Sequence, residues 1–261
     1  MRIIRLFSAA LILAFLVSFL PMRRAYAGAL TVNNLGDGAW VWWDGTCTLR
    51  EAIDTANWGA TTDCGNGAGA DTITFSVSGA ITLTAGQFWI GDNITINGGG
   101  TIIIDGNNGT RIFQVASAGS LTLHNLALQN GQVAGNGAAV ENDGTLTVDN
   151  VTFSNNQVTG AWNGGGAIFN DGTATLSGAT FQNNQSQAGN GGAIFNTTNG
   201  VLTVDNSIFD GNQVTAPFTV GGAIHNEGSL TVSGTTFQNN QCYRCFKCPD
   251  SQQRLSGQQR L

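Results

Sequence analysis

Four aspartates stand where their side chains could act in pairs. Asp143 and Asp171 occupy equivalent places in two successive copies of a sequence repeat, and Asp149 and Asp205 occupy equivalent places two copies apart. Two carboxyl groups about 5–5.5 Å apart can hydrolyse a glycosidic bond with retention, and groups about 6.5–9.5 Å apart can do so with inversion. These four residues are therefore the catalytic candidates if the chain is a carbohydrate-active enzyme.

The local sequence favours a simpler interpretation of the same aspartates. Asp143 and Asp171 each precede a glycine, and Asp-Gly is typical of an ordinary tight turn. The residue that stands between Asp149 and Asp205 in the repeat is Ser177, which suits a solvent-facing position. Turn chemistry thus explains the acids without catalysis, and the enzyme is kept as the alternative.

Basic residues are scarce. Over residues 28–241 the only bases are Arg50 and Arg111, against 15 acids, so the formal net charge of this segment is −13. Nucleic-acid binding needs a cationic surface, so it is excluded for this segment. A polysaccharide lyase also needs a basic side chain to abstract its proton. His124 and His225 stand at non-equivalent positions, and we expect both on the surface or in strands.

The elements that must position these residues are repeats. Four copies of a small-small-Ala-aliphatic phrase begin at Gly137, Gly165, Gly191 and Gly221, and each is followed shortly by an asparagine: Asn142, Asn170, Asn196 and Asn226. Each copy ends in Phe-x-x-Asn-Gln, and the four phenylalanines recur at one constant interval. Self-similarity at a fixed period indicates stacked units, none of which can bury its apolar face alone.

The repeat unit consists of strands. Segments such as Thr145-Leu146-Thr147-Val148 alternate polar and apolar residues, and no unit contains a long helical pattern. Three short strands and three turns fill one unit, as in one coil of a parallel β-helix. Charged residues are 10% of the chain, and there are 37 glycines and 27 asparagines, which suits a solenoid with many turns. We therefore predict an all-β, single-stranded right-handed parallel β-helix of six or seven coils.

Equivalent residues of stacked coils form ladders with a step of about 4.8 Å. The sequence predicts an interior ladder of Phe153, Phe181, Phe209 and Phe237, and an amide ladder of Asn156, Asn184, Asn212 and Asn240 in a turn. The same step would place Asp143 about 5 Å from Asp171, and Asp149 roughly 9.6 Å from Asp205.

The segment 1–27 resembles a secretory signal peptide. Arg2 and Arg5 precede the apolar stretch Leu6 to Leu20, and Ala25-Tyr26-Ala27 provides a small-x-small cleavage site. An uncleaved anchor is the alternative, but this apolar stretch falls short of the roughly 20 residues that span a bilayer. We expect cleavage after Ala27 and no transmembrane segment in the mature chain.

An exported chain can form disulfides, and Cys47 and Cys64 flank one short helical pattern. Leu49, Ile53 and Ala56 share a helical face, which predicts an amphipathic helix tied by a Cys47–Cys64 disulfide. A solenoid needs a cover over its open end, and this helix is placed to be an N-terminal cap. Arg50 and Glu51 are expected to have structural roles there.

Two motifs carry a family resemblance. Cys47-Thr48-Leu49-Arg50-Glu51-Ala52-Ile53, with Cys64 beyond, resembles the CSLREA motif of secreted bacterial β-helix proteins, with Thr48 in place of serine. The Gly-Gly-Ala-Ile and Phe-x-x-Asn phrases over about 137–241 are similar to the repeats of polymorphic outer-membrane proteins. The resemblance implies an exported right-handed β-helix at or beyond the cell surface, often adhesive.

The predicted domain boundaries are 1–27 for the signal peptide, 28–71 for the cap, 72–241 for the coils and 242–261 for a tail. Strand-like runs between the cap and the repeats add less regular coils: 71–77, 80–84, 93–97, 101–105, 111–116 and 120–123. Asn97 to Gly100 and Asp105 to Gly109 are predicted as turns between them. Calcium binding by these clusters is disfavoured because the Gly-Gly-x-Gly-x-Asp nonapeptide is absent.

The tail departs from the repeat. Cys242, Cys245 and Cys248 are spaced like metal ligands, but zinc takes four and no fourth Cys or His is near. The leading interpretation is a disordered tail of foreign sequence, from a frameshift or a premature end of a longer gene. A metal knuckle and a disulfide-linked tail are the alternatives.

The sequence thus favours a secreted or cell-surface module, associated with the outer membrane, of structural or adhesin type and without catalysis. Its expected partners are a host-cell surface, a glycan or extracellular matrix. No cofactor and no metal are expected. The alternative is a polysaccharide hydrolase or lyase on the same fold, since the fold alone does not decide function.

Overall fold

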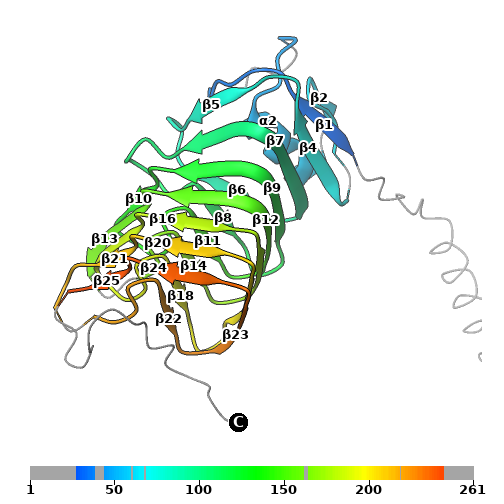
Figure 1. Cartoon of the computed structure of the whole chain (residues 1–261). Coiled ribbons are helices and arrows are strands. Elements are labelled where there is room, and N and C mark those ends of the chain that lie inside the picture. Colours follow the sequence, from blue (N-terminus) through cyan, green and yellow to red (C-terminus); the bar gives the residue numbers. More distant parts are fainter. Residues whose placement is uncertain are drawn as a thin grey trace, which may run out of the picture.

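The computed structural model describes residues 28–38, 44–59, 61–67, 69–161, 164–217 and 219–243. The predicted signal peptide and all of the predicted tail except Cys242 and Tyr243 lie outside these residues. Within them the chain is an all-β solenoid of parallel strands with one short helix (Figure 1). The predicted fold class is therefore confirmed.

Three parallel sheets run along the solenoid. The long sheet follows the order β1 (Ala29–Val32), β4 (Asp71–Phe75), β7 (Asn93–Asp105), β9 (Ser120–Gln129), β12 (Thr145–Ser154), β15 (Thr173–Ser177), β19 (Val201–Asp205) and β23 (Ser229–Ser233). It also includes β5 (Gly79–Thr82), β16 (Thr180–Gln182), β20 (Ile208–Asp210) and β24 (Thr236–Gln238).

The other two parallel sheets close each coil. The five-stranded sheet consists of β10 (Gln132–Val133), β13 (Gln157–Ala161), β17 (Gln185–Ala188), β21 (Gln213–Val214) and β25 (Gln241–Cys242). The six-stranded sheet consists of β6 (Phe88–Ile90), β8 (Phe113–Val115), β11 (Val140–Asn142), β14 (Ile168–Asn170), β18 (Ile194–Asn196) and β22 (Ile224–Asn226). A separate antiparallel pair joins β2 (Thr61–Thr62) to β3 (Gly65–Asn66).

The solenoid has about five turns, fewer than the six or seven predicted. The difference arises because the long sheet begins before the others. Its first two strands in the order, β1 and β4, pair with each other in parallel, whereas the five-stranded sheet begins only at β10. The segment 28–71 thus contributes a strand to the long sheet as well as the helix.

Several strands are longer than predicted because they pass through a bend without losing their pairing. β9 and β12 each contain an asparagine in the left-handed region, Asn125 at φ 51° and Asn150 at φ 53°. The predicted turn from Asn97 to Gly100 is wrong for the same reason. These residues lie inside β7, where the register with β9 shifts between Asn97 and Ile102. The predicted turn at Asp105 to Gly109 is confirmed, with Asn107 and Asn108 at positive φ.

The core consists of the inward-facing residues of stacked strands. Alternation of apolar and polar residues buries every second side chain, as in the pattern of β11, buried, half-buried, buried. Leu146, Val148, Leu176 and Val204 are at most 1% exposed, and equivalent residues pair from coil to coil. The apolar area buried between coils is thus continuous along the solenoid.

Candidate functional site

Charged side chains gather around the six-stranded sheet. Arg111 precedes β8, Glu141 lies in β11, Asp143 follows β11, and Asp171 follows β14. Parallel stacking brings these residues together, because β8 pairs with β11 and β11 with β14. The cluster contains one of the two predicted aspartate pairs and adds Glu141, which the sequence analysis did not single out.

Arg111 is the centre of the cluster and is 8% exposed. Its Nη1 lies 2.9 Å from a carboxylate oxygen of Glu141 and donates a hydrogen bond to Oε1 of Gln87 at 2.8 Å. Its Nε and Nη2 donate to the carbonyl of Asn136, and Nε also donates to that of Gly137. A guanidinium with this many acceptor contacts is fixed in place, and it ties the loop before β11 to β8.

Two acids of the cluster, Glu141 and Asp143, have raised pKa values. Burial, the largest cause, raises the pKa of Glu141, with Asp143 adding to the rise and Arg111 opposing it. Burial also raises the pKa of Asp143, followed by repulsion from Asp171, while Arg111 opposes. Burial lowers the pKa of Arg111 from its ordinary value, although Glu141 and Asp143 counteract this, and the guanidinium remains protonated. Two carboxyls with raised pKa values are a feature that catalytic sites share with structural ion-pair networks.

The pair Asp143 and Asp171 lies in two successive tight turns. Asp171 accepts hydrogen bonds from the hydroxyl of Thr197 and, at 3.2 Å, from the amide of Asn199. Its backbone N–H donates to the carbonyl of Asn142 in the preceding coil. The Asp171 side chain is therefore hydrogen-bonded to the next coil of its own chain, which is a structural role typical of a turn residue.

The second predicted pair lies on the long sheet. Asp149 pairs with Ser177 and Ser177 with Asp205, so the two aspartates lie two strand steps apart, as the spacing predicted. Nδ1 of His124 lies 3.2 Å from a carboxylate oxygen of Asp149, and the hydroxyl of Ser233 donates to Asp205. His124 is thus half of a surface pair, and the two aspartates have separate partners.

The predicted phenylalanine positions form a stacked interior column. Phe153 and Phe181 have ring centroids 4.6 Å apart, and Phe181 and Phe209 have centroids 4.5 Å apart, with interplanar angles of 3° and 5°. All three are 0% exposed. Phe237 continues the column at 4.9 Å but is half-buried, because it lies in the last described coil.

The predicted asparagine positions form an amide ladder, with Asn156, Asn184 and Asn212 fully buried and Asn240 half-buried. Nδ2 of Asn156 donates to Oδ1 of Asn184 at 2.9 Å, Asn184 donates to Asn212 at 2.9 Å, and Asn212 donates to Asn240 at 2.8 Å. Nδ2 of Asn184 also donates to the carbonyl of Phe153 in the preceding coil. Each amide therefore satisfies its neighbours, which offsets the cost of burying it.

A second ladder formed where the sequence analysis noted the asparagines but predicted no contact. Asn142, Asn170, Asn196 and Asn226 are linked by amide hydrogen bonds of 2.7 Å at each step. The sequence signal that could have predicted this ladder is the fixed position of these asparagines after the aliphatic residue of each copy. At the start of the ladder, Oδ1 of Asn142 is buried and has no hydrogen-bond partner among the described residues, since its neighbour in the preceding coil is Val115.

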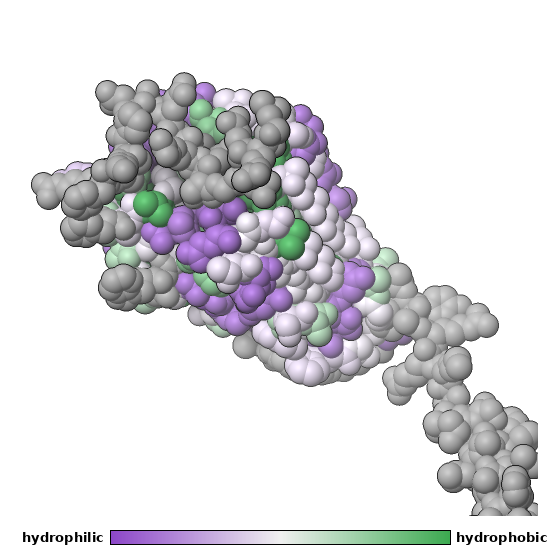
Figure 2. Space-filling model, turned by 90° about the horizontal axis from the view of Figure 1, so that it is seen from below, coloured by the Kyte–Doolittle hydropathy of each residue, from purple (hydrophilic) through white to green (hydrophobic). Residues whose placement is uncertain are grey.

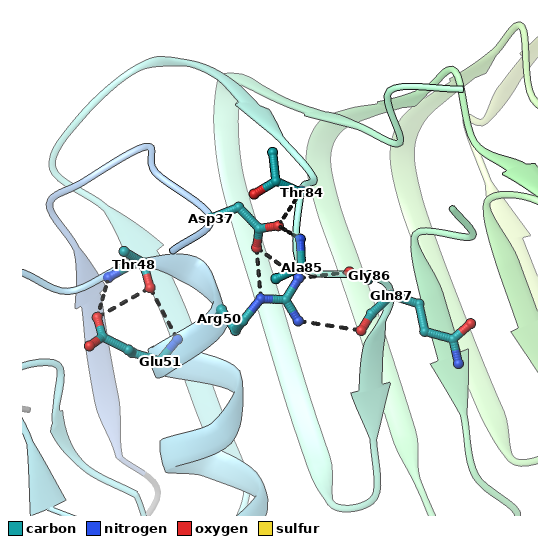
Figure 3. Close-up of polar contacts among 8 residues, drawn as sticks. All are labelled: Asp37, Thr48, Arg50, Glu51, Thr84, Ala85, Gly86 and Gln87. Carbon is teal, nitrogen blue, oxygen red and sulfur yellow. Dashed lines mark hydrogen bonds and ion pairs between the residues drawn. The ribbon is translucent and has the colours of Figure 1, made fainter. Parts of the chain in front are cut away.

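Helix α2 (Leu49–Trp58) follows Cys47, and Leu49, Ile53 and Ala56 are buried as predicted. It begins with a capping box. The backbone N–H of Thr48 donates to a Glu51 carboxylate oxygen at 2.9 Å, and the Thr48 side chain accepts from the N–H of Glu51 (Figure 3). Glu51 is therefore occupied by the helix itself.

Arg50 fastens the helix to the solenoid (Figure 3). Its Nη2 lies 2.7 Å from Oδ1 of Asp37 and donates to the carbonyl of Gly86 at 2.7 Å. The other oxygen of Asp37 accepts from the backbone N–H groups of Thr84 and Ala85. The ion pair is nearly dry, with side-chain exposures of 11% and 1%, and it joins the helix to the segment before β6.

The predicted disulfide between Cys47 and Cys64 is present. It ties the start of α2 to the turn between β2 and β3. Of the tail cysteines, Cys242 ends β25, where it pairs with Val214. Cys245 and Cys248 lie outside the described residues.

A metal site and a membrane span each require a particular arrangement of residues. Among the described residues, no three His, Cys, Asp or Glu side chains converge as metal ligands would. No helix in that part of the chain is long and apolar enough to cross a membrane. On the face seen in Figure 2, hydrophobic residues stand as isolated spots among hydrophilic and neutral ones.

Comparisons with protein-family models, with curated proteins and with solved structures give no match to this chain.

Proposed function

We propose that this chain is an exported, right-handed β-helix module of CSLREA type that works at the cell surface or beyond it as a structural or adhesin-type element, without catalysis. Helix α2 serves as its N-terminal cap. The support for this role is the way the solenoid uses its polar groups. Ladders of amides and aromatic rings join coil to coil, which suits an extended scaffold that presents a surface.

One observation carries the non-catalytic role. Three of the four candidate aspartates have partners in the chain: Asp149 with His124, Asp171 with Thr197 and Asn199, and Asp205 with Ser233. A glycosidase needs two carboxyls directed at one bond of the substrate. Here Asp171 is hydrogen-bonded to the next coil, and Asp149 and Asp205 have separate partners on the long sheet, which favours structure over reaction.

The export, the outer-membrane association and the host-surface or matrix partners remain part of this proposal. They rest on the N-terminal basic-apolar segment and on the resemblance of the cap and repeats. A cap also fits the contacts of α2, whose Arg50 bonds to the turn before β6 and whose buried face packs into the core.

The alternative, a carbohydrate-active enzyme, has one observation in its favour. Glu141 and Asp143 both have raised pKa values beside Arg111, and a raised pKa is what a general acid needs near neutral pH. Asp143 is the residue of this cluster best exposed for such a role. Against it, Glu141 is ion-paired with Arg111 and only 17% of its side chain is exposed.

The deciding experiment measures binding and turnover on the same sample. The full chain, exported from a bacterial host, would be applied to a panel of cells, matrix proteins and glycans, and incubated with neutral and acidic polysaccharides. Binding without release of new sugar ends supports the proposal. Turnover that Asp143→Asn, or Asp149→Asn, lowers about a hundredfold with folding intact would replace the proposal with a glycosidase, since this is the effect of losing a general acid or base.

A further inference from the structure

One row of outward-facing side chains runs the length of the six-stranded sheet. Its strands stack one after another in Figure 1, and their central residues are in register. The row reads Trp89, Gln114, Glu141, Phe169, Phe195 and His225. With a step of about 4.8 Å per strand, its five steps span about 24 Å.

The first end of the row is an exposed aromatic pair. Trp89 stacks on Trp58, the last residue of α2, with ring centroids 5.9 Å apart and planes inclined by 20°. Trp58 is 67% exposed and Trp89 is 44% exposed. Among the described aromatic residues that precede Tyr243 in the sequence, these two are the most exposed. Large aromatics left in water indicate an interaction surface, because burying them elsewhere would have stabilised the fold.

A side chain joins the two backbone segments that carry the pair. The side chain of Asn57 donates to the carbonyl of Trp89 at 2.7 Å and accepts from the N–H of Gly91 at 2.9 Å. This bridge fixes the end of α2 against β6, which places Trp58 beside Trp89 before any ligand arrives. A preorganised surface binds more tightly because less conformational entropy is lost.

The second end of the row is also aromatic. Phe169 and Phe195 meet edge to face with centroids 5.5 Å apart, and the ring of His225 lies 5.0 Å from that of Phe195. All three are half-buried, so part of each ring reaches the surface. The row thus has aromatic rings at both ends, and His225 at its last position lies 3.1 Å from a carboxylate oxygen of Glu227.

The middle of the row is polar and fixed. Oε1 of Gln114 accepts from Gln87 at 2.6 Å, and Gln87 in turn accepts from Arg111. Glu141 is held by the same arginine. The middle therefore presents amide and carboxylate groups in set positions, suited to hydrogen bonds with hydroxyl groups.

The charge of the surface selects the ligand class. Arg50 and Arg111 are the only Arg or Lys residues in the described part of the chain, and each is paired with an acid. A uronate or sulfated polymer would find no free cation and would meet Glu141 instead. A globular protein partner needs a contact area of about 1,000 Å² or more, whereas this row is narrow and alternates aromatic with polar groups.

We infer that this row binds a neutral polysaccharide chain lengthwise, with sugar rings on the Trp58–Trp89 pair and on Phe169 and Phe195, and hydroxyl groups over Gln114 and Glu141. A pyranose ring offers an apolar C–H face to an aromatic ring and hydroxyl groups at its edge, which matches the two kinds of groups in the row. The inference rests on the proposed surface role and names its ligand class.

The test is affinity electrophoresis of the full exported chain in gels that contain hydroxyethylcellulose, galactomannan or polygalacturonate. We expect retardation by a neutral polymer and not by polygalacturonate. Trp58→Ala should weaken that binding about tenfold, a loss of about 1.4 kcal/mol, and Trp89→Ala should do the same. The control is Val201→Ala. Val201 lies on the long sheet and is 45% exposed, close to the value for Trp89, and its variant should bind like the wild type.

Ligand length and folding provide two further readouts. Affinity for neutral oligosaccharides should rise with chain length until one molecule spans both aromatic ends. Trp58 lies at the exposed end of a helix, so its variant should keep the wild-type circular dichroism spectrum and unfolding midpoint. Phe195→Ala gives a second, independent loss at the other end of the row.

Several outcomes would overturn the inference. These are an absence of retardation by either neutral polymer, equal binding of Trp58→Ala and Val201→Ala, or preference for polygalacturonate. New sugar ends are also measured after the full chain has been incubated with each polymer in solution. Their release would contradict the non-catalytic role and leave the binding row in place, whereas intact polymer without binding would contradict this inference alone.

Discussion

Phe181→Ala probes the interior column most directly. The side chain is fully buried and stacks on Phe153 at 4.6 Å and on Phe209 at 4.5 Å. Truncating a core phenylalanine costs about 3–5 kcal/mol. Two lost ring contacts, about 0.5–1.5 kcal/mol each, are part of that cost. The neighbours cannot close the cavity, because each is anchored in its own strand, so we expect the upper half of the range.

The assay is urea unfolding followed by circular dichroism, with the free energy of unfolding taken from midpoint and slope. Phe169→Ala is the matched control. It removes the same atoms in the same coil, but Phe169 faces outward from β14, is half-buried and meets Phe195 edge to face. The control should lose at least about 2 kcal/mol less than Phe181→Ala. A loss under about 1 kcal/mol at Phe181, or equal losses at both positions, would refute the interior column.

Three further expectations concern the disulfide, the amide ladder and the acid cluster. Replacing both Cys47 and Cys64 with alanine should cost about 3 kcal/mol of unfolding free energy, and unreduced peptide mass spectrometry of the wild type should show the bond; free thiols at both positions would contradict it. Asn184→Ala should cost about 1–3 kcal/mol by stranding its partners, and Asn184→Asp should cost more at pH 7 than at pH 3, because a carboxylate cannot donate to Asn212; the reverse order in urea melts would count against the ladder. The pKa of Asp143 is raised above 3.8, so its charged form destabilises the fold above that folded pKa and not below 3.8. Asp143→Asn should therefore raise the urea midpoint at pH 7 and leave it unchanged at pH 3, and equal effects at both pH values would exclude the charge as the cause.

The regular repeats could be predicted because their coils have equal length. Phe153, Phe181 and Phe209 recur at the same interval along the chain, and strand pairing places them in register. Once the period implies stacking, sequence spacing alone gives the contact between coils. The same reasoning placed Asp149, Ser177 and Asp205 in one row.

The irregular coils could not be predicted in this way. His124 precedes its partner Asp149 by less than one repeat period, since the coil from β9 to β12 is shorter. The interval from Phe169 to Phe195 is also shorter than the interval from Phe195 to His225, so the aromatic row has no fixed period. Register between such coils is set by loop length and by bends such as the one in β7, and neither follows from local pattern.

The sequence by itself determined the parallel solenoid, the helix with its disulfide, the phenylalanine column and the amide ladder that begins at Asn156, because each depends on local alternation or on a constant period. Only the tertiary structure decided which charges meet. Arg111 reaches Glu141 and Gln87 across three strands whose spacing in sequence is unequal, and Arg50 takes Asp37 as its partner while Glu51 caps the helix. Burial then raised the pKa values of Glu141 and Asp143. Burial and charge contacts depend on how coils of different length close on one another in three dimensions, and a period along the chain does not contain that information.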